Sequence, residues 1–207
     1  MMHSKKLVLV HGIWVRGYIM QHLAQALRAA GFQTYIYSYP STRYPLRQQA
    51  HYLLDYLDRE GIAQADFVAH SMGGLLLRHL AELDPQRIVA AVTIATPHQG
   101  SLVAAAICGK YLGWLLGKTY EQGLDGQLPA WPADIPLGSL AGDHCVGLGR
   151  IFTRFASACD GTVQVSETLL PQLSAHRILH HSHTGILYSA ETATEIDHFL
   201  RMHCFSR

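Results

Sequence analysis

Hydrophobic positions along the chain alternate between short unbroken runs and stripes at helical spacing. A short unbroken apolar run is typical of a strand that is covered on both faces, as in a parallel sheet. Apolar residues three or four positions apart, such as Leu23 and Leu27, instead line one face of a helix. The predicted strands are Lys6–Val10, Thr34–Tyr39, Asp66–Ala69, Ile88–Ala95, Pro136–Ala141 and His176–His181.

Helical stripes separate the first four predicted strands, and a further stripe, Glu191–His203, follows the last one. Strands joined through helices favour right-handed crossovers and parallel pairing, with helices on both faces of the sheet. A length of 207 residues is sufficient for one domain with a large core. We therefore predict a single α/β domain over residues 1–207, a three-layer α/β/α sandwich. Its sheet is expected to be mostly parallel, with about six strands, and to carry a helical insertion.

Residues 100–135 form a long segment that does not fit the strand–helix alternation. Its first part, Ser101–Gly117, is almost wholly apolar but is interrupted by Lys110 and by three glycines. A membrane-spanning helix needs about 20 mostly apolar residues, so we expect no transmembrane segment here. The segment is either a lid-like insertion over a binding site or an ordinary pair of buried helices.

Composition excludes several classes of function. Hydrophobic residues make up 49% of the chain and charged residues 15%, which fits a compact enzyme better than a disordered chain. The 16 basic and 15 acidic residues nearly cancel, so no nucleic-acid partner is expected. The 14 histidines show no regular metal-ligand spacing. The run Asp143-His144-Cys145 is a weak metal candidate, because adjacent residues rarely converge on one ion, and no metal is expected.

The cysteines and the N-terminal residues bear on the compartment. The chain has four cysteines, Cys108, Cys145, Cys159 and Cys204. They are widely spaced without a Cys-x-x-Cys pair, so we expect buried free thiols. The apolar run Leu7–Val10 stops at His11, whereas a signal peptide needs an apolar region of about 7–15 residues. A cytoplasmic location is therefore expected.

Ser71 lies in a run of mostly small residues between a predicted strand and a predicted helix. The run is Ala69-His70-Ser71-Met72-Gly73-Gly74, and the helical stripe begins at Leu75. A serine in such a strand–turn–helix stands on a sharp, strained turn at the carboxyl end of a parallel sheet. The strain requires small residues two positions before and after the serine, and Ala69 and Gly73 meet this requirement. The sequence therefore predicts a nucleophile elbow with Ser71 at its tip.

A serine hydroxyl needs a base within hydrogen-bond reach, because it is a poor nucleophile at neutral pH. His183 stands just past the last predicted strand, where a loop can turn its ring toward Ser71. His180 and His181 are the rivals, but they lie in or at the edge of that strand. We therefore expect His183 to be the general base.

Two aspartates are candidates for the acidic residue that orients the base. Asp160 is followed by Gly161, which suits a tight loop. Asp143 directly follows the predicted strand Pro136–Ala141, after which the acid usually comes, and is otherwise a surface turn residue. A helical-looking stretch, Val146–Ala156, separates the two aspartates. Topology leaves the choice open.

The negative oxygen of a tetrahedral intermediate needs two preorganised donors. One is expected to be the backbone N–H of Met72, at the positive end of the helix after the elbow. The other is expected from the loop after the first strand, His11-Gly12-Ile13-Trp14, with Ile13 as the donor. Gly12 lets that loop turn close to the site, and the His11 side chain is interpreted as structural.

Five separated segments together resemble the α/β-hydrolase superfamily, and more narrowly its small bacterial lipase- and esterase-like members. The segments are Leu9–Gly12, Ala69–Gly74, Ala95–Gly100, Asp160–Val163 and His183–Leu187. The resemblance favours Asp160 as the acid and implies ester hydrolysis through an acyl-enzyme, with no metal or organic cofactor. Ala69 stands where larger relatives have the first glycine of Gly-x-Ser-x-Gly. Their two leading antiparallel strands also have no room here, so the resemblance is to a minimal core of the fold.

The predicted function is that of a serine esterase or lipase acting on a small-molecule ester. The apolar insertion suggests an apolar acyl group on the substrate. The residues expected to contact the substrate are Trp14, Leu102, Leu112, Trp114 and Leu115. The same catalytic residues would also serve a thioesterase, an amidase or an acyltransferase. A further alternative is a ligand-binding protein that keeps the fold without turnover.

Overall fold

Over residues 5–147 and 149–206, the part of the chain that the structure describes, the computed structural model contains one six-stranded sheet. Every strand pairs in parallel with its neighbours, in the order β2-β1-β3-β4-β5-β6. The strands are β1 (Lys6–Val10), β2 (Gln33–Tyr37), β3 (Ala65–His70), β4 (Ile88–Ile94), β5 (Leu137–Gly142) and β6 (Ala175–Leu179). The predicted α/β fold class is confirmed, and the sheet is wholly rather than mostly parallel.

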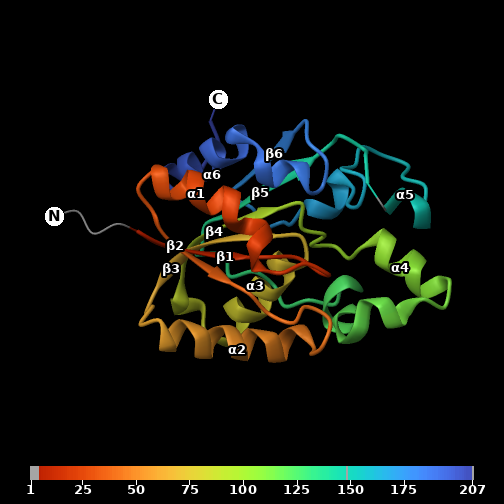
Figure 1. Cartoon of the computed structure of the whole chain (residues 1–207), viewed down its shortest axis with the longest axis horizontal. Helices are drawn as coiled ribbons and strands as arrows, with labels where there is room; N and C mark the ends of the chain where they lie inside the picture. The colour runs from red at the N-terminus through yellow and green to blue at the C-terminus, as the bar shows by residue number, and fades with distance from the viewer. Residues whose placement is uncertain (1–4, 148, 207) are drawn as a thin grey trace.

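Helices cover both faces of this sheet, as Figure 1 shows, with α1 and α6 on one side and α2 and α3 on the other. The helices are α1 (Gln21–Ala29), α2 (Leu46–Arg59), α3 (Met72–Leu83), α4 (Leu102–Gly109), α5 (Gly149–Phe152) and α6 (Ala190–Met202). Short helical turns are η1 (Gly17–Met20), η2 (Pro85–Arg87), η3 (Gly113–Thr119), η4 (Tyr120–Leu124), η5 (Val165–Thr168) and η6 (Gly185–Tyr188).

Alternate residues of each strand enter two separate cores. In β1, Leu7 and Leu9 pack with α1 and α6, whereas Val8 and Val10 pack with α2 and α3. All four side chains are fully buried. Burying one such side chain contributes roughly 1.5–3 kcal/mol, so the unbroken apolar run of β1 stabilises both layers at once.

The segment 100–135 packs against the α2–α3 side of the molecule. Val103, Ala104 and Ile107 of α4 and Leu116 of η3 belong to the same buried cluster as α2 and α3. The Ser101 hydroxyl caps α4 by accepting a hydrogen bond from the Ala104 N–H at 3.1 Å. In the part of the chain that the structure describes, no helix has the length and apolar character needed to cross a membrane.

The stretch between the two candidate aspartates is less helical than its sequence suggests. Among the described residues of the predicted stretch Val146–Ala156, only α5 forms, and it is four residues long. At Gly149, the first residue of α5, the backbone packs closely against another loop: a Cβ on Gly149 would lie 2.5 Å from the carbonyl oxygen of Gly161.

The expectation of buried free thiols is wrong for most of the cysteines. Cys145 and Cys159 form a disulfide with a Cα–Cα distance of 5.1 Å. Cys108 is free and half-buried, and Cys204 is free but exposed. The spacing of 14 residues between Cys145 and Cys159 gave no sign of a pair, because folding of the intervening loop brings the two sulfurs together.

Candidate active site

Ser71 stands on a strained turn between β3 and α3. Its backbone has φ 54° and ψ −127°, in a region that residues with a Cβ seldom adopt. Backbone approaches closely on one side, since a Cβ on Gly73 would lie 2.7 Å from the carbonyl oxygen of His11, and side chains approach on the other. A Cβ on Gly74 would lie 2.4 Å from Oγ1 of Thr96. The small residues of the predicted elbow are thus needed where they stand.

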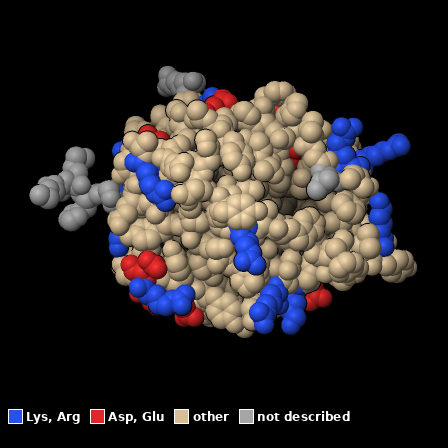
Figure 2. All heavy atoms as spheres, in the orientation of Figure 1, with Lys and Arg blue, Asp and Glu red and all other residues tan. Residues whose placement is uncertain are grey.

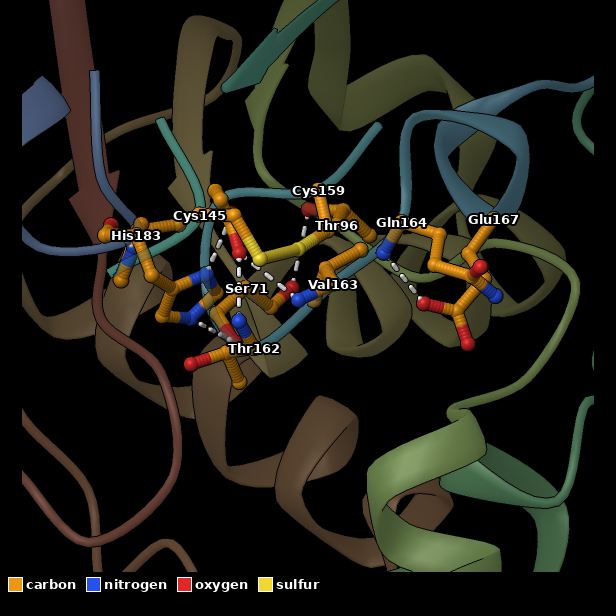
Figure 3. A network of polar contacts seen from close by, with 11 residues as sticks. Ser71, Thr96, Cys145, Cys159, Thr162, Val163, Gln164, Glu167 and His183 are labelled. Atoms are coloured by element: carbon orange, nitrogen blue, oxygen red, sulfur yellow. Dashed lines mark hydrogen bonds and ion pairs between the residues drawn. A yellow bond between two sulfur atoms is a disulfide. The ribbon is translucent and has the colours of Figure 1, made fainter. Parts of the chain in front are cut away.

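Two hydrogen bonds from neighbouring chain segments hold this turn. The Ser71 N–H donates to the carbonyl of Ile94 at 2.8 Å. The Thr96 hydroxyl donates to the carbonyl of Ser71 at 2.9 Å, and Figure 3 shows these two residues. Both partners come from the end of β4 and the residues after it. The segment Ala95–Gly100, one of the five that carry the family resemblance, therefore helps to hold the turn through the hydrogen bond of Thr96.

A chain of hydrogen bonds joins Ser71 to His183 and Asp160. Oγ of Ser71 lies 3.1 Å from Nε2 of His183, and Nδ1 of His183 lies 2.7 Å from Oδ2 of Asp160 (Figure 3). An ionised carboxylate only accepts, so Nδ1 carries the proton and Nε2 accepts from the serine hydroxyl. The three residues follow β3, β5 and β6, whose carboxyl ends lie at one edge of the parallel sheet.

The Asp160 carboxylate is fully enclosed and well supplied with donors. It is 1% exposed, and Oδ1 accepts from the N–H groups of Thr162 at 2.8 Å and Val163 at 2.7 Å. The carbonyl of Asp160 also accepts from the His183 N–H at 2.9 Å. Buried ionised groups are tolerated when such donors meet them. Asp160 therefore contacts His183 through both its side chain and its backbone.

The competing residues lie together elsewhere. Asp143 accepts from Nδ1 of His180 at 2.8 Å, and the His180 side chain is 78% exposed. His181 faces Glu191, with 3.5 Å between Nε2 and a carboxylate oxygen. The structure thus brings Asp160 rather than Asp143 to His183, and His183 rather than His180 or His181 to Ser71. Cys145, in the run Asp143-His144-Cys145, is disulfide-bonded and offers no thiolate to a metal.

The loop after β1 lies directly against the elbow. A Cβ on Gly12 would lie 2.9 Å from Cβ of Ser71, so only glycine fits at this approach. His11 anchors the loop to Tyr39. The two ring centroids are 4.4 Å apart in a stacked arrangement, and Nε2 of His11 accepts a hydrogen bond from the Tyr39 N–H at 3.1 Å. Burial lowers the pKa of His11 below its ordinary value, which favours the neutral ring that this bond needs.

A cavity of about 400 Å³ opens beside Ser71 and His183. Figure 2 shows a hollow in the molecular surface on the side where α4 and α5 lie. Much of the wall is apolar and includes Trp14, Val103, Val146 and Phe152 together with glycines 12, 147 and 149. The arrangement can hold an apolar group next to the serine hydroxyl.

The predicted substrate contacts are distributed unevenly around this cavity. Trp14 lines it, and the Trp14 indole N–H donates to the carbonyl of Leu115 at 2.7 Å. Leu102 borders a different pocket, Leu112 and Leu115 pack on the core, and the Trp114 side chain is 74% exposed. From the insertion, Val103 reaches the cavity wall instead.

Val146, Gly147, Gly149 and Phe152 were not among the predicted contacts, although they form part of the wall. The disulfide between Cys145 and Cys159, drawn in Figure 3, closes the loop that contains them. The sequence signal that could have pointed to this wall is the pair of cysteines on either side of it. Because the two cysteines were expected to be free thiols, nothing in the sequence was a reason to place the loop between them at the cavity.

Glu167 links the insertion to the loop of Asp160. Its carboxylate oxygens accept from the N–H groups of Leu102 and Gln164, each at 2.6 Å, and Figure 3 shows the Gln164 contact. Glu167 is 8% exposed, and this burial raises the pKa of its carboxyl. One buried side chain thus holds both the beginning of α4 and the end of the acid loop.

Within residues 5–147 and 149–206, no three His, Cys, Asp or Glu side chains lie close enough together to hold a metal ion.

A family sequence model described as the alpha/beta hydrolase family matches residues 7–200. Two proteins named triacylglycerol lipase, from Pseudarthrobacter phenanthrenivorans and Burkholderia plantarii, are each 38% identical over 50 residues, or 24% of this chain. The matched stretch covers 16% and 14% of the lengths of these two lipases. The sequence likeness to named lipases is therefore local.

Solved structures extend the likeness over the whole chain. Lipase BlEst2 from Bacillus licheniformis, in its mature form, superposes with a TM-score of 0.73 at 18% identity, over 98% of this chain and 93% of that chain. Carboxylesterase CesB from Bacillus subtilis gives a TM-score of 0.62 at 15% identity, over 97% and 85%. At these identities the likeness shows the fold alone. With the family model matched over nearly its full length, the chain belongs to the alpha/beta hydrolase family.

Proposed function

We propose that the protein is a serine hydrolase that cleaves small-molecule carboxylic esters through an acyl-enzyme. The observation that carries the proposal is the hydrogen-bond chain from Ser71 through His183 to Asp160, with lengths of 3.1 and 2.7 Å. A serine becomes a nucleophile when a base lies within reach and a third group orients that base. The apolar cavity beside Ser71 supplies the space for an acyl group.

The proposed reaction has two halves. In the first, Oγ of Ser71 attacks the ester carbonyl carbon while Nε2 of His183 takes the hydroxyl proton, which it then gives to the departing alcohol. In the second, a water molecule loses a proton to Nε2 and attacks the acyl-enzyme, releasing the carboxylic acid and restoring Ser71. Asp160 stabilises the imidazolium that forms in each half. The reaction uses no metal or organic cofactor.

We assign the oxyanion donors to the backbone N–H groups of Ile13 and Met72. Met72 is the first residue of α3, and the first N–H groups of a helix have no acceptor within it. Gly12 supports the other assignment, because it brings the Ile13 loop against the Cβ of Ser71. Loss of one such donor typically costs about 10²–10³ in rate.

The cavity wall supports a substrate with an apolar acyl group. In this proposal Trp14, Val103, Val146 and Phe152 contact that group. Residues 100–135 act as a cap at one side of the cavity, within a single domain over residues 1–207. Leu102, Leu112, Trp114 and Leu115 were also predicted to contact the substrate. They would do so only if the cap moved, and their contact with the substrate stays a prediction.

The test is a panel of p-nitrophenyl esters of increasing acyl length, run with the wild type and the variant Ser71→Ala. We expect ester turnover that falls by about 10⁶-fold in the variant, as for loss of a serine nucleophile elsewhere. Ser189→Ala, which removes only the hydroxyl that caps α6, is the matched control and is expected to keep activity. Residual activity in Ser71→Ala would refute the assignment of the nucleophile.

Thioester and amide substrates and a competing alcohol complete the panel. Faster cleavage of thioesters or amides would make the protein a thioesterase or an amidase, and ester products formed with the added alcohol would indicate an acyltransferase. A fluorophosphonate probe is expected to label Ser71 of the folded wild type. Failure of this labelling would favour a ligand-binding protein without turnover.

A cytoplasmic location stays a prediction, and the disulfide provides its test. Disulfides are rare in the reducing cytosol and persist in oxidising compartments. When cells are lysed directly into a denaturant that contains a thiol reagent, Cys145 and Cys159, the second of which is buried in the folded protein, should be modified if the protein lies in the cytoplasm. Protection of both cysteines, with Cys204 modified as the exposed control, would contradict this location.

A further inference from the structure

The residue directly before Ser71 makes a hydrogen bond that the proposed reaction does not use. His70 is the last residue of β3, and its side chain is 4% exposed. Its Nε2 lies 2.9 Å from the carbonyl oxygen of His183. Because a carbonyl only accepts, Nε2 must carry the proton, and the ring is then a donor at Nε2 and an acceptor at Nδ1. Among the described residues, Nδ1 has no hydrogen-bond partner.

His70 and Ser71 together fix both ends of the base. His70 bonds to the backbone oxygen of His183, and Ser71 bonds to Nε2 of its ring at 3.1 Å. The His183 N–H donates to the carbonyl of Asp160 at 2.9 Å, so both polar backbone groups of His183 have a partner. Adjacent residues of the elbow therefore determine where the His183 backbone lies and how far its ring is from the hydroxyl.

The His70 ring also lies against the His183 ring, with centroids 4.8 Å apart and an interplanar angle of 48°. Burial is the main cause that lowers the pKa of His70 to about 3, and the neighbouring His183 is the second. His70 is therefore neutral at neutral pH and adds no second positive charge beside the imidazolium that the proposed reaction forms on His183. A side chain in this place can donate to His183 without opposing its protonation.

We propose that His70 is a positioning residue, whose Nε2–H donor holds the backbone of His183 at the distance that lets Ser71 transfer its proton. This inference rests on the proposed function and adds a residue to it. It makes no use of the unpaired Nδ1, which faces Gly12. A misplacement of the base by about 1 Å can cost about 100-fold in rate, so a lost backbone anchor should be measurable.

The variants His70→Leu and His70→Gln separate the donor from the volume of the ring. Leucine removes the donor, whereas glutamine can place an amide N–H close to the position of Nε2. His79→Leu is the matched control. His79 of α3 is 3% exposed, its Nε2 lies 2.7 Å from the carbonyl of Gln122, and its Nδ1 also has no partner among the described residues. It loses the same kind of hydrogen bond outside the candidate site.

We expect His70→Leu to lower kcat about 10- to 100-fold with KM nearly unchanged, and to slow fluorophosphonate labelling of Ser71 by a similar factor. His70→Gln should recover most of both rates, and His79→Leu should keep wild-type kcat. Melting temperatures of all variants ensure that only folded protein is compared. If His70→Leu does not fold, His70→Asn replaces it, because its shorter amide does not reach the His183 carbonyl.

Three results would overturn the inference: wild-type kcat in the donor-deficient variant, equal loss in His79→Leu, or no recovery in His70→Gln. The Ser71→Ala control keeps this outcome distinct from failure of the proposed function. An inactive Ser71→Ala beside fully active His70 variants refutes only the role of His70. An active Ser71→Ala refutes the proposed function itself.

Discussion

The disulfide between Cys145 and Cys159 ends directly before Asp160, whose carboxylate lies 2.7 Å from Nδ1 of His183. The loop that this bond closes also carries Val146, Gly147, Gly149 and Phe152 of the cavity wall. One covalent link therefore constrains two parts of the candidate site, the carboxylate beside the base and the surface opposite the serine.

Removal of this link should weaken both the fold and the site. The double variant Cys145→Ser, Cys159→Ser is expected to lower the free energy of unfolding by about 3 kcal/mol, because a loop of about 15 residues is no longer closed in the unfolded chain. The esterase kcat should fall as well, since the acid loop gains freedom. Urea unfolding and ester kinetics measure the two effects. Cys204→Ser, at an exposed free cysteine, is the control. An unchanged kcat in the double variant would show that Asp160 keeps its place without the disulfide.

The two aspartates that compete in the sequence can be separated by charge removal. Asp160→Asn keeps the shape of the side chain but places an amide or a carbonyl against Nδ1 of His183, which disturbs the tautomer that leaves Nε2 free to accept. We expect kcat to fall by about 10⁴-fold, as for the equivalent change in other serine hydrolases. Asp143→Asn disturbs only the exposed contact with His180 and should leave kcat within about twofold of the wild type. Equal losses in the two variants would contradict the assignment of Asp160.

Local patterns made much of the fold and the elbow predictable. The run Lys6–Val10 is β1 to the residue, because its four consecutive apolar residues Leu7–Val10 are buried on both faces of the sheet. The small residues around Ser71 indicated the turn, since only small side chains fit where neighbouring backbone comes within contact distance. These features depend on residues close together in the sequence, and a periodic pattern is sufficient to detect them.

The cavity wall and the disulfide were not predictable in the same way. Cys145 meets Cys159, and Gly149 meets Gly161, only after the loop after β5 has folded back on itself. The choice between Asp160 and Asp143 had the same difficulty, because the first aspartate after the strand is not the one that the folded loop brings to the base. Leu112 is hydrophobic, as residues that line an apolar cavity are, but in the folded chain it packs against the core. The sequence alone does not distinguish these two places.

Asp66 makes the stability of the fold depend on pH. It is 2% exposed in β3, its nearest cation is Nζ of Lys5 at 3.9 Å, and burial raises its pKa to about 6. In the unfolded chain the pKa of an aspartate is about 3.9. From about pH 4 to pH 6 the folded state binds more protons than the unfolded state, so stability falls as pH rises through this window.

The variant Asp66→Asn removes this dependence. At pH 8 it should be more stable than the wild type by about 3 kcal/mol, and the difference should shrink toward pH 4, where the wild-type carboxyl is protonated in the folded state. Urea unfolding across this range measures it. Asp55→Asn, at an exposed position of α2, is the control and should follow the wild type. A wild-type stability that rises from pH 4 to pH 6 relative to Asp66→Asn would contradict the argument.

Phe152 should limit the length or bulk of the acyl group. It is half-buried at the end of α5, it lines the cavity, and Nζ of Lys110 lies 5.9 Å from its ring centroid. Phe152→Ala widens the cavity, so kcat/KM for long p-nitrophenyl esters should rise relative to that for the acetate. A change of about 10-fold in this ratio is expected, because each methylene that fits an apolar pocket is worth about 1–3 kcal/mol. Phe155→Ala is the matched control, since Phe155 is also half-buried against the same core cluster but does not line the cavity. If both variants left the ratio unchanged, the acyl group would bind elsewhere, and the cap formed by residues 100–135 would be the next surface to test.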